Sequence, residues 1–325
     1  MSIYLVTGAA GFIAFKVIDL LLEEGHQVIG IDNLNTAYDP RIKHWRLEQL
    51  TSRSGFTFYH ADICDRRHLE EIQASHQPIG AVIHLAARAG VRYSVEDPWS
   101  FVDSNITGTL NLLELSRRNG IRKFVLASTS GVYGNNPPLP TREDADSSRP
   151  LQPYAASKKS SELLAHSYHH LHGLDITVFR YFTVYGPAGR PDLALFRFIQ
   201  WIVENHPVLV NGDGMQSRGF THLDDIARGT LLGLKPLGYE IINLGGHQTV
   251  TVNELIERVS KITGKTANIM NLPINCADIR ASWADTGKAR DLLGWEPKVT
   301  LEEGIPRMVD WYLKERSWAS QIITE

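Results

Sequence analysis

Tyr154 and Lys158, a tyrosine and a lysine four positions apart, are the residues of this chain whose types and spacing could support proton transfer. Side chains four positions apart share one face of an α-helix. Free tyrosine ionises near pH ~10, and a nearby ammonium group lowers that pKa because it favours the phenolate. The pair can therefore accept a proton at neutral pH if the fold brings a substrate to it. Taken alone, the spacing also fits a solvated helix face.

The start of the chain predicts a turn that can hold the phosphates of a nucleotide. Residues 3–7 form a short apolar run that predicts a strand, Gly8 and Gly11 follow it, and a helical pattern begins at Phe12. Glycines at such a turn let the backbone approach a pyrophosphate, and the helix N-terminus favours its negative charge. The spacing is Gly-x-x-Gly-x-x-Ala instead of Gly-x-Gly-x-x-Gly. Its place between a strand and a helix makes a plain turn the weaker interpretation.

An aspartate at the end of the second predicted strand, residues 27–32, indicates which dinucleotide would bind. A carboxylate at this place accepts hydrogen bonds from ribose hydroxyls and repels a 2′-phosphate, so Asp32 favours NAD over NADP. Asp62 follows the third predicted strand. There it can reach an adenine ring or, equally well by its spacing, cap the next helix.

Strand-like and helix-like segments alternate over the first 180 residues. Strand-like runs continue near residues 56–60, 81–85, 123–128 and 175–180. Helix-like stretches lie near residues 66–75, 98–119 and 153–172. Buried strands separated by helices predict an α/β fold with a Rossmann-like, doubly wound parallel sheet. We expect a dinucleotide-binding domain over residues 1–180, completed by a segment near 220–245, and a smaller C-terminal α/β substrate part over residues 181–325.

Composition and charge exclude several classes of partner. The chain has 325 residues, 43% of them hydrophobic and 21% charged, and a formal net charge of -3. No basic block and no long apolar run occurs, so we expect neither nucleic acid nor a membrane as partner. The two cysteines, Cys64 and Cys276, lack metal-ligand spacing, and the N-terminus predicts a strand instead of a signal peptide. We therefore expect a cytoplasmic protein without a metal.

Longer motifs give the chain a family resemblance. They lie at residues 7–13, 84–87, 125–134, 154–158 and 180–187. Together they resemble the extended short-chain dehydrogenase/reductase family, the NAD-dependent nucleotide-sugar epimerases and dehydratases, over nearly the whole chain. Within that family, residues 32–40, 89–94 and 186–192 look most like UDP-glucuronate 4-epimerases.

The resemblance implies a role for each of a set of residues. Tyr154 would be the catalytic base and Lys158 its partner, which also holds the nicotinamide ribose, while Thr129 would lie beside the substrate hydroxyl. The residues expected to line the NAD site, besides Tyr154 and Lys158, are Gly8, Gly11, Phe12, Ile13, Asp32, Asn33, Asp62, Ile63, Ala86, Ala87 and Asn105. Those expected to contact the UDP-sugar are Thr129, Ser130, Thr183, Arg190, Arg218 and Asp278. Asp278 follows a segment, residues 275–277, that departs from the family's pattern.

The resemblance also narrows the reaction. Dehydratases of the family carry an Asp-Glu pair after this threonine, and decarboxylases carry a glutamate two residues after it. Here the two positions are Ser130 and Gly131, and neither side chain can act as an acid. Return of the hydride to the opposite face, which is epimerisation, needs no further acid. Arg190 could bind a sugar carboxylate with its planar fork, or could be a structural loop arginine.

We therefore expect a 4-epimerase that interconverts UDP-glucuronate and UDP-galacturonate with NAD. The alternatives are a 4-epimerase of neutral UDP-hexoses or UDP-N-acetylhexosamines, a UDP-glucuronate decarboxylase, and a catalytically silent dinucleotide-binding module. By analogy with the family, we expect a homodimer formed by the helices near residues 98–119 and 153–172.

Overall fold

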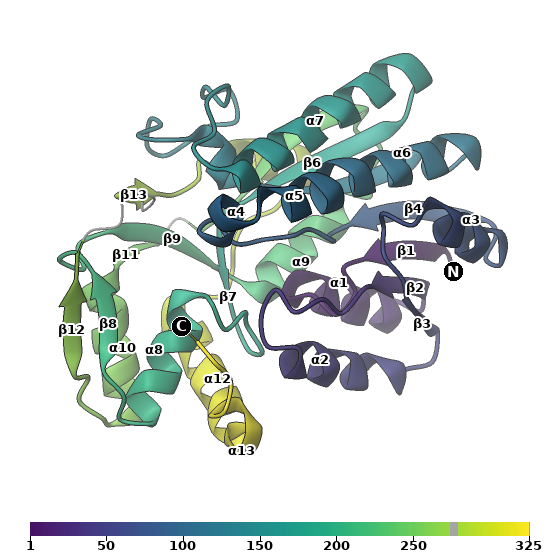
Figure 1. Cartoon of the computed structure of the whole chain (residues 1–325). Coiled ribbons are helices and arrows are strands. Elements are labelled where there is room, and N and C mark those ends of the chain that lie inside the picture. The colour runs from purple at the N-terminus through teal and green to yellow at the C-terminus, as the bar shows by residue number, and fades with distance from the viewer. Residues whose placement is uncertain (247, 274–278, 325) are drawn as a thin grey trace.

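The computed structural model describes residues 1–246, 248–273 and 279–324. Figure 1 shows a large sheet with helices on both of its faces and, beside it, a smaller region in which short strands pack against helices. Within the described residues, no helix is long and apolar enough to cross a membrane.

The large sheet contains seven strands, and all of its neighbouring strands run parallel. Their order across the sheet is β3 (Phe56–His60), β2 (Gln27–Asp32), β1 (Ile3–Thr7), β4 (Ile79–His84), β5 (Lys123–Thr129), β6 (Asp175–Tyr181) and β10 (Tyr239–Leu244). This order confirms the doubly wound α/β fold. The direction of winding reverses between β1 and β4, and in open α/β sheets ligands bind at that switch point.

Two hydrophobic cores cover the two faces of this sheet. One face packs against α1 (Phe12–Glu23), α2 (Arg41–Thr51), α9 (Leu223–Leu232) and α11 (Gly287–Leu293). The other packs against α3 (Arg66–Ala74), α6 (Gly108–Arg118) and α7 (Pro153–His172). Adjacent strand residues alternate between these cores, Leu5 on one side and Val6 on the other, as a strand with two buried faces requires.

Two elements differ from the sequence analysis. The helix expected over residues 98–119 is α5 (Pro98–Phe101), a π-helical stretch η1 (Val102–Thr107) and α6; the short α4 (Tyr93–Glu96) precedes them. Helix α2 was not predicted, because two of its five buried residues, Lys43 and Arg46, are charged and interrupt the apolar pattern.

The smaller region has its own core. Strand β9 (Ser217–His222) pairs with β7 (Thr183–Tyr185), β11 (Thr249–Thr251) and β13 (Ala281–Ser282), and β8 (Val208–Asn211) pairs with β12 (Ile269–Leu272). The helices are α8 (Ala194–Val203), α10 (Val252–Thr263), α12 (Leu301–Lys314) and α13 (Arg316–Ala319). Their core is rich in aromatic side chains such as Phe196, Trp201 and Trp311. Between β9 and β11 the chain returns to the large sheet to form α9 and β10.

Candidate active site

Helix α7 presents Tyr154 and Lys158 from its first two turns. Pro153 is the first helical residue, where a missing backbone N–H costs nothing. The side chain of Lys158 is only 1% exposed, and its Nζ has no hydrogen-bond partner among the described residues. Burial lowers the pKa of this ammonium group to about 8. A buried charge without a partner is costly, so this atom is a strong candidate for ligand binding.

The carboxylate nearest to Lys158 along the helix is already committed elsewhere. Glu162 lies one turn further on and is buried. Its Oε1 accepts hydrogen bonds from Arg180 Nε at 2.9 Å and Ser128 Oγ at 2.6 Å, and its Oε2 accepts one from Arg180 Nη2 at 2.7 Å. These bonds of Glu162 join α7 to Ser128 of β5 and Arg180 of β6. They leave the ammonium of Lys158 for another partner.

Tyr154 stands among groups that act on its ionisation. Burial, the largest effect, raises the pKa of its phenol, and the charge of Asp192 also raises it. The charge of Arg190 and a hydrogen bond with Thr129 lower it. The net direction is upward. The ring also packs edge-on against Phe101, with 6.1 Å between ring centroids. The ligand-free protein therefore keeps this phenol protonated at neutral pH, and further positive charge would be needed to make it a base.

The turn between β1 and α1 lies at the switch point of the sheet. Gly8 has a φ of +73°, and a Cβ on it would lie 2.8 Å from the backbone of Ala86, which follows β4. A Cβ on Gly11 would lie 2.7 Å from the carbonyl oxygen of Gly8. Gly11 also occupies the N-cap of α1 and leaves the first-turn N–H groups without a side-chain cap. This arrangement suits a bound pyrophosphate.

Polar residues gather at the ends of β2 and β3 beside this turn. Asp32 accepts hydrogen bonds from the backbone N–H groups of Ala10, at 3.1 Å, and Leu34, at 2.8 Å. Asn33 Nδ2 donates to Asp62 Oδ2 at 2.8 Å, so the structure brings these two predicted residues together. The side chain of Ile63 instead packs in the apolar core.

Asn105 lies in η1 and has no free polar atom on its side chain. Its Oδ1 accepts a hydrogen bond from Arg88 N at 2.8 Å, and its Nδ2 donates to Arg88 O at 3.0 Å and Ser157 Oγ at 2.8 Å. The residue therefore ties the segment after β4, which contains Ala86 and Ala87, to helix α7. The structure gives it this linking position and no atom directed at a ligand.

The residues predicted to contact the substrate come from both regions. Thr129 ends β5, and its Oγ1 accepts a hydrogen bond from Gly131 N at 3.1 Å. Ser130 begins the short 3-10 helix Ser130–Tyr133 that follows. Thr183 begins β7 and pairs with Phe220 on the neighbouring strand β9. Arg218 lies on β9 as well, two residues before Phe220. Asp278 lies outside the described residues.

Arg190 differs most from its expected environment. Its Nε and Nη2 hold the two carboxylate oxygens of Asp192 at 3.0 and 2.5 Å. The fork that could bind a substrate carboxylate is therefore directed at a carboxylate of the protein itself. Nη1 donates to no described residue. The guanidinium also lies over the Tyr38 ring, 6.0 Å from its centroid.

Three observations show that these residues fit a dinucleotide. The glycine turn has no room for a Cβ; among residues 1–246, 248–273 and 279–324, no side chain caps the N-terminus of α1 and none bonds to the buried Lys158 Nζ. Sequence reasoning missed one buried residue beside this site, Arg46 of α2. The sequence does contain a sign of its burial, because Arg46 lies four positions from the apolar Ile42 and from the apolar Leu50 and so shares their helix face.

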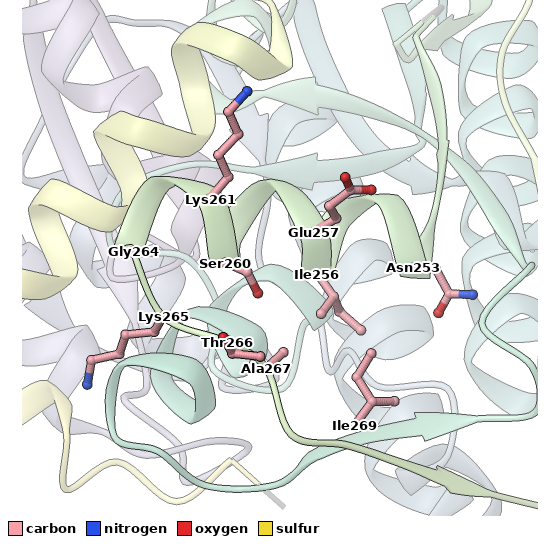
Figure 2. Close-up of a pocket in the computed structure, with 10 residues that line it drawn as sticks. All are labelled: Asn253, Ile256, Glu257, Ser260, Lys261, Gly264, Lys265, Thr266, Ala267 and Ile269. Carbon is pink, nitrogen blue, oxygen red and sulfur yellow. The ribbon is translucent and has the colours of Figure 1, made fainter.

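A separate open groove of about 560 Å³ lies between α10 and β12. Figure 2 shows Ile256 and Ile269 pointing toward each other across it. None of the predicted site residues that the structure describes lines this groove, so we place the active site at the switch point of the large sheet.

Comparisons with known proteins identify relatives over nearly the whole chain. Residues 4–245 match the family model described as "NAD dependent epimerase/dehydratase family". The chain is 55% identical over 312 residues to a UDP-glucuronate 4-epimerase from Thermodesulfobacterium geofontis, with 96% of each chain covered. The structure resembles a Bacillus cereus UDP-glucuronic acid 4-epimerase in complex with UDP-glucuronic acid and NAD (TM-score 0.91, 36% identity, 96% and 99% covered). It also resembles a Thermotoga maritima UDP-glucose 4-epimerase with UDP-glucose (TM-score 0.89, 36% identity, 97% and 99% covered).

Proposed function

The chain belongs to the NAD-dependent epimerase/dehydratase family, and from that premise we propose that it interconverts UDP-glucuronate and UDP-galacturonate by inverting C4 of the sugar acid. The observation that carries the proposal is the buried ammonium of Lys158, which has no partner in the described part of the chain and lies one helical turn from Tyr154, beside a glycine turn suited to a dinucleotide.

The cofactor is NAD, and the residues at the switch point would hold it. The pyrophosphate would lie on the Gly8–Gly11 turn, the adenosine ribose near Asp32, and the nicotinamide ribose on Lys158, whose three N–H donors would gain acceptors there. Bound there, NAD would supply the acceptor for the hydride of C4 and the donor that returns it to the opposite face of the sugar. No external oxidant is consumed in that cycle.

Tyr154 would be the acid–base group for the proton of the C4 hydroxyl. Its phenolate would accept that proton as the 4-keto sugar forms, and its phenol would return the proton when the sugar is reduced. Thr129 shares a hydrogen bond with Tyr154 and would hold the same hydroxyl from the end of β5. Burial raises the pKa of this phenol, so positive charge brought by the bound cofactor would favour the phenolate.

Epimerisation fits the remaining side chains better than elimination or decarboxylation. Ser130 and Gly131 follow Thr129, and neither offers a carboxyl group to protonate a leaving group or an enolate. Reduction of the 4-keto sugar from its other face needs no such group.

The substrate carboxylate would be bound by Arg190 through Nη1, with Thr183 as a second donor. Because Arg190 Nε and Nη2 already donate to Asp192, the contact with the substrate carboxylate would be monodentate. Because Asp192 also neutralises much of the Arg190 charge, this contact would give selectivity more than tight binding. A neutral sugar remains the second candidate, since the Thermotoga maritima relative is a UDP-glucose 4-epimerase.

Replacing Arg190 with alanine discriminates between these two substrates. Arg190 also lowers the pKa of Tyr154, and the part of the loss that comes through Tyr154 falls on both sugars alike. We expect kcat/KM for UDP-glucuronate to fall by roughly tenfold to a hundredfold more than kcat/KM for UDP-glucose, because only the sugar acid loses a charged donor worth about 1.5–3 kcal/mol. Arg142→Ala, which alters an exposed arginine paired with Asp144, is the matched control. Equal losses for both sugars would favour the neutral substrate.

We also propose that the protein is a homodimer. Large apolar side chains are exposed along α5, η1, α6 and α7, namely Trp99, Val102, Leu110, Leu163 and Leu171. Helices α6 and α7 pack together, and Figure 1 shows them side by side along one edge of the molecule. A second copy that packs on these helices would cover this surface.

A cytoplasmic location stays a prediction from the cysteine usage.

The direct test of the activity uses purified enzyme, UDP-glucuronate and no added NAD. The proposal predicts UDP-galacturonate, detected by its proton spectrum, because the cofactor is regenerated in each cycle. UDP-pentose and CO2 as the only products would replace the epimerase by a decarboxylase.

A further inference from the structure

Arg46 is a fully buried arginine that no described carboxylate neutralises. Its guanidinium donates to three groups from three separate segments. Nη1 donates to the carbonyl oxygen of Ala10 and to the hydroxyl of Tyr38, each at 2.9 Å. Nε and Nη2 donate to the carbonyl oxygen of Ala188 at 3.1 and 2.6 Å. One side chain thus connects the glycine turn of the cofactor site to the segment just before Arg190.

Aromatic contacts extend the same connection. The Arg46 Cζ lies 5.7 Å from the ring centroids of both Phe12 and Tyr38, and the Cζ of Arg190 lies 6.0 Å from the Tyr38 centroid. Arg190, Tyr38, Arg46 and Phe12 therefore form a series of alternating cations and rings, and cation–π attraction favours this order. At one end stands the first residue of α1, at the other the arginine beside Tyr154.

The backbone held by Arg46 is not one that the chain adopts freely. Ala188 has a φ of +51°, in the left-handed region that residues other than glycine seldom occupy. Two hydrogen bonds from Arg46 to its carbonyl oxygen hold it there. Release of that carbonyl would let Ala188 relax and would move Arg190, which lies two residues further on.

The charge of Arg46 also acts on a neighbouring cation of helix α2, Lys43. Burial lowers the pKa of Lys43, the charge of Asp32 opposes that effect, and the charges of Arg46, Arg88 and Arg190 add to it. These cations therefore lie near one another. A pyrophosphate on the glycine turn would offset their repulsion and so stabilise Arg46 in its observed position.

We propose that Arg46 is a positioning residue that couples the two binding sites, so that NAD on the glycine turn strengthens the binding of the UDP-sugar beside Arg190, and the reverse. The inference rests on the proposed function, because it takes the two ligands to be NAD and a UDP-sugar acid. Arg46 itself would touch neither ligand. Its effect passes through Ala10 on one side and Ala188 on the other.

The test measures the coupling between ligands instead of turnover. In Tyr154→Phe protein, in which turnover should be slowed by roughly 10²–10⁴, the Kd of UDP-glucuronate is measured by calorimetry with NAD present and with NAD removed. We expect NAD to tighten binding by a factor within about 5–150, the usual range for coupled sites. Adding Arg46→Met should bring that factor close to one and reduce the NAD retained through purification. Arg46→Lys, which keeps the charge but not the fork, should lie between.

Arg53→Met is the matched control. Arg53 follows the same helix and pairs with Asp19 at the surface, so its loss should leave the coupling factor unchanged. The proposal is overturned if NAD does not affect the Kd in the Tyr154→Phe protein, or if Arg46→Met weakens UDP-glucuronate equally with and without NAD. If Arg46→Met does not fold, Arg46→Lys decides by the same factor. If no variant binds UDP-glucuronate, the proposed function fails, and the same titrations with UDP-glucose, with and without NAD, then decide the role of Arg46.

Discussion

The ammonium group of Lys158 shows, at the scale of one residue, a conflict between stability and ligand binding. It is buried, it lacks a hydrogen-bond partner among the described residues, and its pKa is lowered to about 8. Below that pH the folded protein carries a charge that the unfolded chain would solvate better. A nicotinamide ribose would relieve this cost, because its hydroxyls can accept the N–H donors.

Replacing Lys158 with methionine should therefore stabilise the NAD-free protein while it abolishes activity. At about pH 7 we expect a gain in the free energy of unfolding on the order of 3 kcal/mol at most, since one pKa unit corresponds to about 1.4 kcal/mol. The gain should shrink above about pH 8. There the folded wild-type protein has lost this proton while the unfolded chain keeps it until about pH 10.5, so wild-type stability rises with pH.

Urea denaturation of NAD-free protein at several pH values measures this difference. Lys159→Met is the control, because Lys159 is partly exposed and already bonded to Ser147 and Glu162, so its loss should not stabilise the protein. A Lys158→Met protein that is less stable than wild type at neutral pH would show that the ammonium is not strained in the ligand-free state.

At the scale of elements, the turn between β1 and α1 places the cofactor site at the switch point of the sheet. Gly8 and Gly25 both have positive φ values, +73° and +77°. A Cβ on Gly8 would meet the backbone of Ala86 at 2.8 Å, whereas a Cβ on Gly25 would meet no atom within 4 Å. Substituting each glycine with alanine therefore distinguishes the strain of a positive φ, which both share, from a steric clash of the new Cβ, which occurs only at position 8.

Gly8→Ala should lose bound NAD, and Gly25→Ala should keep it. Both variants lose stability from the left-handed conformation, by about 1 kcal/mol. Only Gly8→Ala must also move the backbone after β4, which forms one wall of the proposed cofactor site. The ratio of NAD to protein after purification, read from the absorbance of the released cofactor, distinguishes them. Equal NAD content in the two variants would place the pyrophosphate elsewhere.

The sequence was sufficient where the pattern was local. The apolar runs of β1 and β2, with Gly8 and Gly11 between them, follow directly from periodicity and glycine spacing. Helix α2 was missed because Lys43 and Arg46 face inward, Lys43 bonded to Asn35 in the preceding loop and Arg46 to Ala188, which is distant in sequence. The Arg190–Asp192 pair was missed because a loop has no period from which to infer where a side chain turns.

At the scale of the whole molecule, an exposed apolar surface on α5 to α7 indicates how two copies would associate. Leu163, in the middle of α7, has 60% of its surface exposed. Leu163→Glu should convert the proposed dimer to a monomer, because a carboxylate would be buried without a partner at the interface. Light scattering coupled to size-exclusion chromatography measures the mass.

Met270→Glu provides the comparison for this prediction. Met270 is 50% exposed but lies on β12, in the other region of the molecule. That variant should keep the wild-type mass. If Leu163→Glu also keeps the wild-type mass, the helices α6 and α7 do not form the interface.

The central claim, that the site inverts C4 of a UDP-sugar acid with a cofactor that stays bound, is tested most directly by isotope transfer. UDP-glucuronate deuterated at C4 is incubated with purified enzyme and no added NAD, and the product is examined by NMR. The account predicts UDP-galacturonate that keeps its deuterium at C4, and a rate lower by roughly 10²–10⁴ in Tyr154→Phe. A product with hydrogen from solvent at C4, or UDP-pentose in place of the epimer, would contradict it.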